Sequence, residues 1–503
     1  MSRWLLLALF VTTPGCSDDT QPADGPLPAD GAAADLRPLD GPAPDTAPAP
    51  CSPASPDGTC PKGRTCRQGA CIVDLDPKQP VADVAALTKL FDTIWSFYDQ
   101  SYGAFPAKPK LDWSAVKATY KPEVVGASTQ FEAVWSLKRM VAEIEDGHTY
   151  ALEKAQCNTT GYWGTPYSNV GACVTEGAGG KLYVYRLGNG NPSGFELGDE
   201  LVSVDGRDVE ALLRDAEHQP RCTIHYSTKA QLRAQLVDGL LHRGPDDRTA
   251  RVRRAGKEVE LTLAPASSPG QMLHCDGVVG VDQPTTHAHG ILEKTLSGDV
   301  LYVYLPLFGG YDGQGTFIVE PVVDELRKVF QNAPGRKGLI LDLRANGGGA
   351  PKVYMALASW LYAQATTLFY CHDKDGTGHD DFKPKWAMTS APDATLQYDG
   401  PLAVLVSPTT FSAGDFTTYF LHATSRAKTF GAASGGGFGS GASQALDTSW
   451  TLGFNNIYCL DLNGKALEGH PPAPDVPVAY ESADLAAGTD TMIEKALAWI
   501  GTR

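Results

Sequence analysis

Short apolar runs alternate with helical patterns from residue 299 onward, and this alternation constrains the fold more than any other feature of the sequence. Residues 300–305, 338–343 and 402–406 are apolar with little interruption, which is typical of strands buried on both faces. Helical patterns at 317–330, 353–363 and 414–423 follow them. Buried strands joined through helices predict a mainly parallel α/β core, in which chemistry collects where the strands end.

A helical region precedes this core. Residues 81–155 carry apolar side chains at helical spacing, so we expect an N-terminal helical domain. Its last helix is expected to run toward Glu145 and to stop at Gly147. The chain is therefore predicted to be a multi-domain α/β protein whose α/β domain occupies residues 276–503.

A β-rich module is expected between the two. Residues 165–265 hold short apolar strands, a turn at Asp205-Gly206 and one helical pattern at 230–241. The segment Gly198-Asp-Glu-Leu-Val-Ser-Val-Asp-Gly206 resembles the central strands of a PDZ domain. Another small β-sandwich is the alternative interpretation.

The N-terminus is typical of an exported lipoprotein. Residues 1–16 combine one positive charge, a short apolar core and Gly15 before Cys16, which predicts a signal peptide with lipidation at Cys16. An ordinary signal peptide with an unpaired Cys16 is the alternative. Residues 17–50 are rich in Pro, Ala and Asp, and this composition predicts a disordered spacer between a membrane anchor and the folded body.

The 11 cysteines agree with export. Four of them, Cys51, Cys60, Cys66 and Cys71, lie in a short Gly/Pro-rich module at 51–75 that two disulfides could stabilise. A zinc knuckle is the competing interpretation, although no Cys-x-x-Cys is present there. The other six are compatible with three disulfides whose pairing the sequence leaves open: Cys157, Cys173, Cys222, Cys275, Cys371 and Cys459.

The charge balance argues against nucleic acid as a partner. The formal net charge is −16, whereas phosphate binding needs clustered Lys and Arg. After the N-terminal apolar stretch, no apolar run is long enough to cross a bilayer.

Two strand ends carry residues suited to acyl-transfer chemistry. Ser412 lies between a buried strand and a helix, so its hydroxyl would face the positive end of the helix dipole and the Ala413 amide could donate to an oxyanion. The glycines 347–349 follow another strand, where a backbone without Cβ can approach a substrate closely. Each feature alone is more often a helix cap or a simple turn.

A serine nucleophile needs a base and a group that orients the base. His148 is the candidate base because it lies at a helix end in Asp146-Gly-His-Thr149. Glu468 is the candidate carboxylate, in a Pro-rich segment that ends at Asp475. From these residues alone, a triad of Ser412, His148 and Glu468 is one arrangement among several.

The order of these motifs resembles the tricorn-core and C-terminal-processing serine peptidase family over about residues 81–503. The shared order is Asp-Gly-His-Thr, a PDZ-like module, Leu-Asp-Leu-Arg-x-Asn-Gly-Gly-Gly, Phe-Ser-Ala-Gly-Asp and a late Glu followed by Pro-Asp. One branch of that family uses a Ser-Lys dyad, but the corresponding position here is Gly437, and no lysine lies between Lys428 and Lys465. The chain therefore resembles the tricorn-like, Ser-His-Glu branch.

The resemblance implies a crotonase-like or ClpP-like α/β spiral. It also implies Ser412 as nucleophile, His148 as base, Glu468 as the orienting carboxylate, and the amides of Ala413 and of Gly347 or Gly348 as the oxyanion hole. The tricorn protease has a serine where this chain has Gly147, so the way in which Glu468 is held is open.

The sequence thus predicts an exported, lipid-anchored serine endopeptidase that acts on peptides or unfolded proteins and requires no metal or other cofactor. A non-catalytic family member that binds a peptide or an apolar ligand is the alternative. An esterase is a third interpretation, but the Gly-x-Ser-x-Gly motif is absent around Ser412. The oligomeric state is left open.

Overall fold

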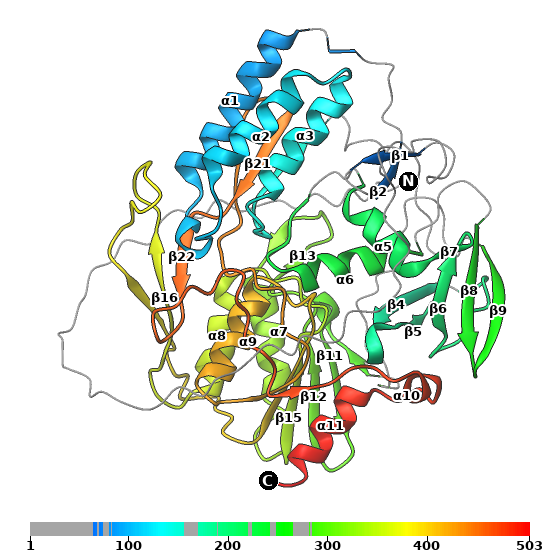
Figure 1. Cartoon of the computed structure of the whole chain (residues 1–503). Helices are drawn as coiled ribbons and strands as arrows, with labels where there is room; N and C mark the ends of the chain where they lie inside the picture. The colour runs from blue at the N-terminus through cyan, green and yellow to red at the C-terminus, as the bar shows by residue number, and fades with distance from the viewer. Residues whose placement is uncertain are drawn as a thin grey trace.

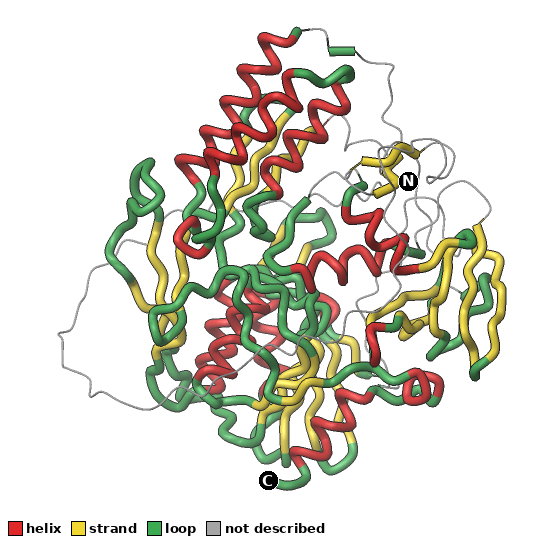
Figure 2. The backbone as a smooth tube through the Cα atoms, in the orientation of Figure 1, coloured by secondary structure: helices red, strands yellow, loops and turns green. Residues whose placement is uncertain are grey.

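The computed structural model describes residues 64–67, 70–73, 80–81, 83–154, 170–188, 190–219, 224–241, 248–264, 281 and 284–503. These residues form a helical bundle, a β module and an α/β domain (Figures 1 and 2). The expected multi-domain α/β class is confirmed by this architecture.

The helical bundle comes first along the chain. Its helices are α1 (Val84–Ser101), α2 (Trp113–Val125) and α3 (Gln130–Ala142), with the short η1 (Phe105–Ala107) between α1 and α2. The side chains of Asp83, Asp112 and Thr129 accept backbone N–H groups at the three helix starts, as good N-caps do. A strand that returns from the α/β domain, β21 (Trp450–Phe454), buries Trp450 and Leu452 in the bundle core.

The last helix of the bundle ends earlier than the sequence suggested. It stops at Ala142, whereas we expected it to continue to Gly147. Glu145 has φ 51°, outside the right-handed helical region, and so the chain has already left the helix there. Strand β3 (Tyr150–Glu153) follows and pairs with β21, which in turn pairs with β20 (Ala442–Ala445).

The β module spans residues 170–264. Its antiparallel sheet has the order β4-β5-β6-β8-β9, with β7 paired to β6. The turn expected at Asp205-Gly206 is present, since both residues have positive φ between β6 and β7. The strands and helices are β4 (Ala172–Glu176), η3 (Ala178–Gly180), β5 (Leu182–Leu187), β6 (Glu200–Val204), β7 (Arg207–Asp208), α5 (Val209–Glu217), α6 (Lys229–Gly239), β8 (Arg248–Arg254) and β9 (Lys257–Leu263).

The α/β domain is built on a seven-stranded sheet of order β10-β11-β12-β15-β18-β19-β23. The strands from β12 to β23 are parallel, and β10 and β11 add antiparallel neighbours at one edge. The strands are β10 (Thr285–Thr286), β11 (Leu292–Leu296), β12 (Val300–Tyr304), β15 (Gly338–Asp342), β18 (Leu402–Val406), β19 (Lys428–Gly431) and β23 (Val476–Pro477). The predicted parallel core is thus present.

Helices cover both faces of this sheet (Figure 1). α7 (Glu320–Phe330), α8 (Pro351–Leu361) and α9 (Ala413–Ala423) pack on one face against alternate strand residues such as Leu341 and Val404. α11 (Thr491–Ile500) packs on the other face against Ile340 and Leu405. The other two helices of this domain are η4 (Ala288–Gly290) and α10 (Ser482–Ala486), both short.

One helix expected in this domain is shorter than the pattern implied. We expected it over 317–330, but α7 begins at Glu320. Phe317–Ile318 instead forms β14, which pairs with β13 (Gly310–Tyr311). The apolar residues of β14 continue the helical spacing of α7, so the sequence pattern did not distinguish this strand from the helix.

A disulfide joins two strands beside the core. β16 (Thr367–Asp373) pairs with β17 (Trp386–Thr389) and β22 (Ile457–Leu460), and Cys371 and Cys459 lie opposite each other in this sheet. These two residues form a buried disulfide, and Cys173 is disulfide-bonded as well. The oxidised pairing agrees with the expectation of disulfides in the body.

The features that predict export, namely the signal peptide, Cys16 and the 17–50 spacer, lie outside the described residues. Of the 51–75 module, only β1 (Arg64–Arg67) and β2 (Ala70–Val73) are described, and they place Cys66 opposite Cys71. No helix within the described ranges is both long and apolar enough to cross a membrane.

Candidate active site

Ser412 stands at the start of α9, after the loop that leaves β18. Its backbone has φ 56° and ψ −117°, a conformation that L residues adopt at a cost of roughly 1–3 kcal/mol. The surroundings must therefore hold it, and its N–H donates to Asp415 Oδ2 at 2.7 Å. The helix dipole of α9 points its positive end at this residue.

Asp415 is fully buried and holds the backbone of Ser412 in place. Besides the Ser412 amide, it accepts the N–H groups of Gly436 at 2.7 Å and Gly437 at 2.9 Å. Burial raises the pKa of Asp415 to about 6, although these backbone donors act in the opposite direction. The backbone of Gly436 and Gly437 thus binds the Asp415 carboxylate. In the Ser-Lys dyad described above, a lysine would take the position of Gly437.

His148 lies in the loop between α3 and β3, and it meets Ser412 although 264 positions separate them. Its Nε2 is 2.9 Å from Ser412 Oγ, a distance at which a hydroxyl proton can pass to the ring. The Phe411 ring stacks on the imidazole, with 4.7 Å between ring centroids. Burial lowers the pKa of His148, while the nearby Asp146 raises it, so the net direction favours a neutral base.

Asp146 is the carboxylate beside the other ring nitrogen. Its Oδ1 lies 3.8 Å from His148 Nδ1 and accepts the His148 backbone N–H at 2.7 Å. Its Oδ2 accepts the Tyr102 hydroxyl at 3.0 Å and the Asn455 side-chain amide at 3.1 Å. Asp146 is thereby held rigidly under the imidazole by the bundle and by the turn after β21.

Gly147 lies in a space that admits no side chain. A Cβ at this position would come within 2.5 Å of the Phe411 ring and 3.2 Å of Ser227 Oγ. The residue before the base must therefore be glycine as long as Phe411 keeps its place.

Glu468 is fully buried in the same region but does not contact the imidazole directly. Its Oε2 accepts the Phe438 N–H at 2.7 Å, and its Oε1 is 3.7 Å from Lys108 Nζ. Burial and the neighbouring Asp146 raise its pKa to about 8, while Lys108, Ser227 and the Phe438 N–H lower it. The structure thus places Asp146, and not Glu468, next to the imidazole of His148.

The oxyanion-hole expectation needs one correction. The Gly348 N–H already donates to Asn346 Oδ1 at 2.8 Å, in a buried position, so it is not free to bind a substrate oxygen. Gly348 instead packs on the nucleophile, since a Cβ there would lie 2.5 Å from Ser412 Cβ. Within the described residues, no acceptor takes the amides of Ala413 or Gly347, and Gly347 is exposed.

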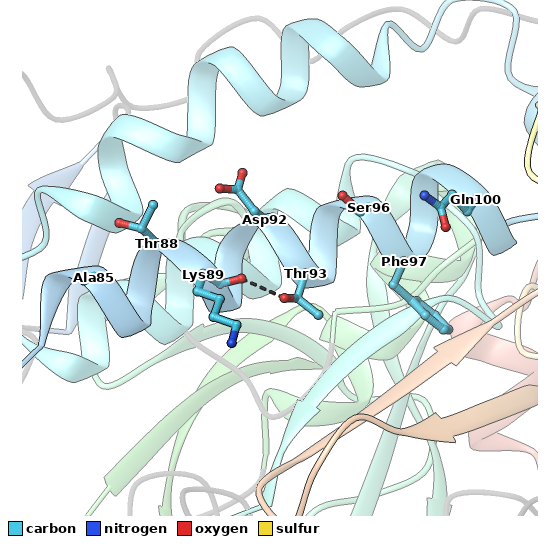
Figure 3. Close-up of a pocket in the computed structure, with 8 residues that line it drawn as sticks. All are labelled: Ala85, Thr88, Lys89, Asp92, Thr93, Ser96, Phe97 and Gln100. Carbon is cyan, nitrogen blue, oxygen red and sulfur yellow. Dashed lines mark hydrogen bonds between the residues drawn. The ribbon is translucent and has the colours of Figure 1, made fainter.

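One surface pocket lies away from this chemistry. A pocket of about 740 Å³ runs along α1, and none of the expected catalytic residues lines it (Figure 3). In the part of the chain that is described, no group of three or more His, Cys, Asp or Glu side chains is arranged to hold a metal ion. The described residues that line the pocket are Ala85, Thr88, Lys89, Asp92, Thr93, Ser96, Phe97 and Gln100.

Sequence reasoning missed several residues of this site. Asp415 had a local signal, because an acidic residue three positions after Ser412 fits a capping box. Asp146 lay in a motif that was noted only for its histidine. Ser227 and Asn455 had no signal, because only the folded chain brings them near Gly147 and Asp146.

Part of the chain matches a known protein family, and solved structures share its fold. Residues 299–478 match the model of peptidase family S41. The structure of mature CPAF complexed with lactacystin is similar, with a TM-score of 0.63, 15% identity, and coverage of 83% of this chain and 98% of that chain. A putative peptidase from Parabacteroides merdae has a TM-score of 0.50, 20% identity, and coverage of 82% and 95%.

These two likenesses show the fold, and no curated protein matches the chain. The family domain at 299–478 contains three of the expected site residues, Ser412, Gly347 and Glu468, whereas His148 lies before it. Residues 299–478 thus form a domain of peptidase family S41, and the comparisons support a serine-type peptidase hydrolase.

Proposed function

We propose that the chain hydrolyses peptide bonds through an acyl-enzyme at Ser412, with His148 as general base. The contact of 2.9 Å between His148 Nε2 and Ser412 Oγ is the observation that carries this proposal. His148 takes the hydroxyl proton as Ser412 attacks the carbonyl carbon, and it then protonates the leaving amine. Water attacks the acyl-enzyme in a second step and regenerates Ser412.

Two amides stabilise the oxyanion in this proposal, those of Ala413 and Gly347. Each such donor is worth about 3 kcal/mol of the barrier in comparable sites. Asp146 faces the other ring nitrogen, and its carboxylate stabilises the imidazolium that forms on proton transfer. Peptides and unfolded proteins are the proposed substrates, because an extended backbone can reach the exposed Gly347.

Replacement of the nucleophile tests the reaction. Ser412→Ala is expected to reduce hydrolysis of an unfolded protein such as reduced casein to the background rate, while the circular dichroism spectrum is unchanged. Wild-type rates in this variant would show that another group does the chemistry. A wild-type chain that binds the unfolded protein without cleaving it would instead support the non-catalytic alternative.

We further propose that the chain is exported and anchored by a lipid at Cys16. The apolar N-terminal stretch, Gly15-Cys16 and the spacer at 17–50 support this, as does the buried disulfide Cys371–Cys459. Expression in a bacterium with radiolabelled palmitate is expected to label the wild-type chain but not Cys16→Ala. Equal labelling of both would contradict the anchor.

A further inference from the structure

Ser227 reaches the active site from the β module. It lies just before α6, and its backbone N–H donates to Gln231 Oε1 at 2.7 Å. Its neighbour Thr228 caps α6 through its own side chain. Ser227 is 5% exposed, so its hydroxyl is held in a fixed direction inside the protein.

This segment holds both backbone polar groups of Gly147, the residue before the catalytic histidine. Ser227 Oγ accepts the Gly147 N–H at 2.8 Å, and His225 Nδ1 donates to the Gly147 carbonyl at 3.0 Å. Both contacts come from the β module, although Gly147 belongs to the loop after the helical bundle. The direction of the His148 backbone therefore depends on where the module sits.

Ser227 also lies near the buried Glu468. It lowers the pKa of that carboxyl, against the effects of burial and of Asp146. The other groups that face Glu468 are Lys108, the Phe438 amide and Tyr102. Ser227 thus contacts the loop of the base and influences the charge of Glu468.

We propose that Ser227 is a positioning residue through which the β module completes the catalytic site. Its oxygen accepts the Gly147 N–H, and the neighbouring His225 holds the Gly147 carbonyl. This inference rests on the proposed function, because it assigns Ser227 a role through His148. Displacement of the module would release both contacts at once, and the site would be competent only with the module docked.

Removal of the hydroxyl tests the proposal in the full-length chain. Ser227→Ala is expected to lower kcat about tenfold or more, as the loss of one buried hydrogen-bond partner does, with KM within about twofold. The rate of labelling of Ser412 by a fluorophosphonate is expected to fall by the same factor. The limb of the kcat–pH profile that reports Glu468 is expected to move to higher pH, because Ser227 lowers the pKa of this carboxyl in the wild type.

The matched control is Ser193→Ala. Ser193 is a buried serine of the same module, but its hydroxyl bonds only to the backbone of Val170 and Ala264. This variant is expected to keep the wild-type kcat and pH profile. A general loss of module stability would lower both variants alike and would overturn the proposal.

A second substitution guards against misfolding. Ser227→Cys keeps the volume but replaces the hydroxyl by a poor hydrogen-bond partner. If this folded variant, or folded Ser227→Ala, keeps the wild-type kcat and pH limb, the proposal is wrong. If wild-type Ser412 is not labelled at all, the proposed function itself fails, which is a different result from equal labelling of wild type and Ser227→Ala.

Discussion

The nucleophile and the base of this site are held in different ways. Ser412 is fixed by its own domain, chiefly by Asp415, three positions away, which also gathers Gly436 and Gly437. His148 is fixed by contacts from the bundle, the β module and the turn after β21. The α/β domain alone therefore supplies a strained serine, and the base is added only when the other parts pack around it.

This difference predicts that substitutions near Ser412 and near His148 have different effects on stability and activity. Changes near Ser412 should disturb stability and activity together, because the same carboxylate holds the core loop and the nucleophile. Changes near His148 should alter the pH dependence and kcat with less effect on folding, because several separate contacts share the load. The predictions below test this contrast.

The largest effect is expected for Asp415→Asn. The side-chain amide has one acceptor oxygen for three backbone donors, so at least one buried N–H is left unpaired. We expect a loss of about 3 kcal/mol in the free energy of unfolding, measured in urea, and a fall in kcat of about a hundredfold or more. Asp447→Asn is the control, since exposed Asp447 also accepts two backbone N–H groups. Equal stability losses in the two variants would remove the distinction we draw.

Asp146→Asn is expected to act mainly on the base. The carboxylate raises the pKa of His148 and of Glu468, so its removal lowers both. The parts of the kcat–pH profile that report His148 and Glu468 should therefore move to lower pH. The plateau value of kcat should fall about tenfold, because the imidazolium loses its charged partner. A profile that keeps the wild-type limbs would show that Asp146 does not govern the base.

Glu468→Gln is expected to change the pH dependence of stability. The pKa of Glu468 is raised from 4.5 to about 8 in the fold, so the wild-type carboxyl favours folding below pH 4.5 and loses that contribution as pH rises through 8. The glutamine variant lacks this loss, and its stability relative to wild type should increase from about pH 5 to about pH 9. Urea unfolding across this range checks it, and a constant difference would contradict the raised pKa.

Phe411→Leu should give the smallest effect. The Phe411 ring stacks on His148 and fills the space beside Gly147 and Gly437. A leucine keeps most of the apolar contact but loses the stacking, which costs about 1 kcal/mol. The rate of fluorophosphonate labelling should fall about fivefold, and the free energy of unfolding should fall by about 1 kcal/mol. A much larger fall would mean that the base is held chiefly by this ring.

Much of the α/β core was predictable because its signal is local. Continuous apolar runs such as 338–343 and 402–406 predict strands that are buried on both faces. The observed strands β15 and β18 lie within these two runs. Errors came where the local pattern was ambiguous. The helical spacing before Glu320 concealed β14, and Gly147 looked like a helix stop although it is glycine because Phe411 leaves no room for Cβ.

The site was predictable only in part. Ser412 and His148 could be chosen from their motifs, and the structure brings them together. That Asp146 and not Glu468 faces the imidazole depends on long-range packing through Tyr102 and Asn455. That Gly348 is already hydrogen-bonded depends on the conformation of Asn346, which three glycines in a row do not reveal.

Peptide mapping of a fluorophosphonate adduct tests the Ser412–His148 pair most directly. The account predicts that mass spectrometry of the treated wild-type chain finds the adduct at Ser412 alone, and that His148→Ala loses it while remaining folded. An adduct on another residue, or labelling of His148→Ala at the wild-type rate, would show that the hydroxyl is not activated by this imidazole.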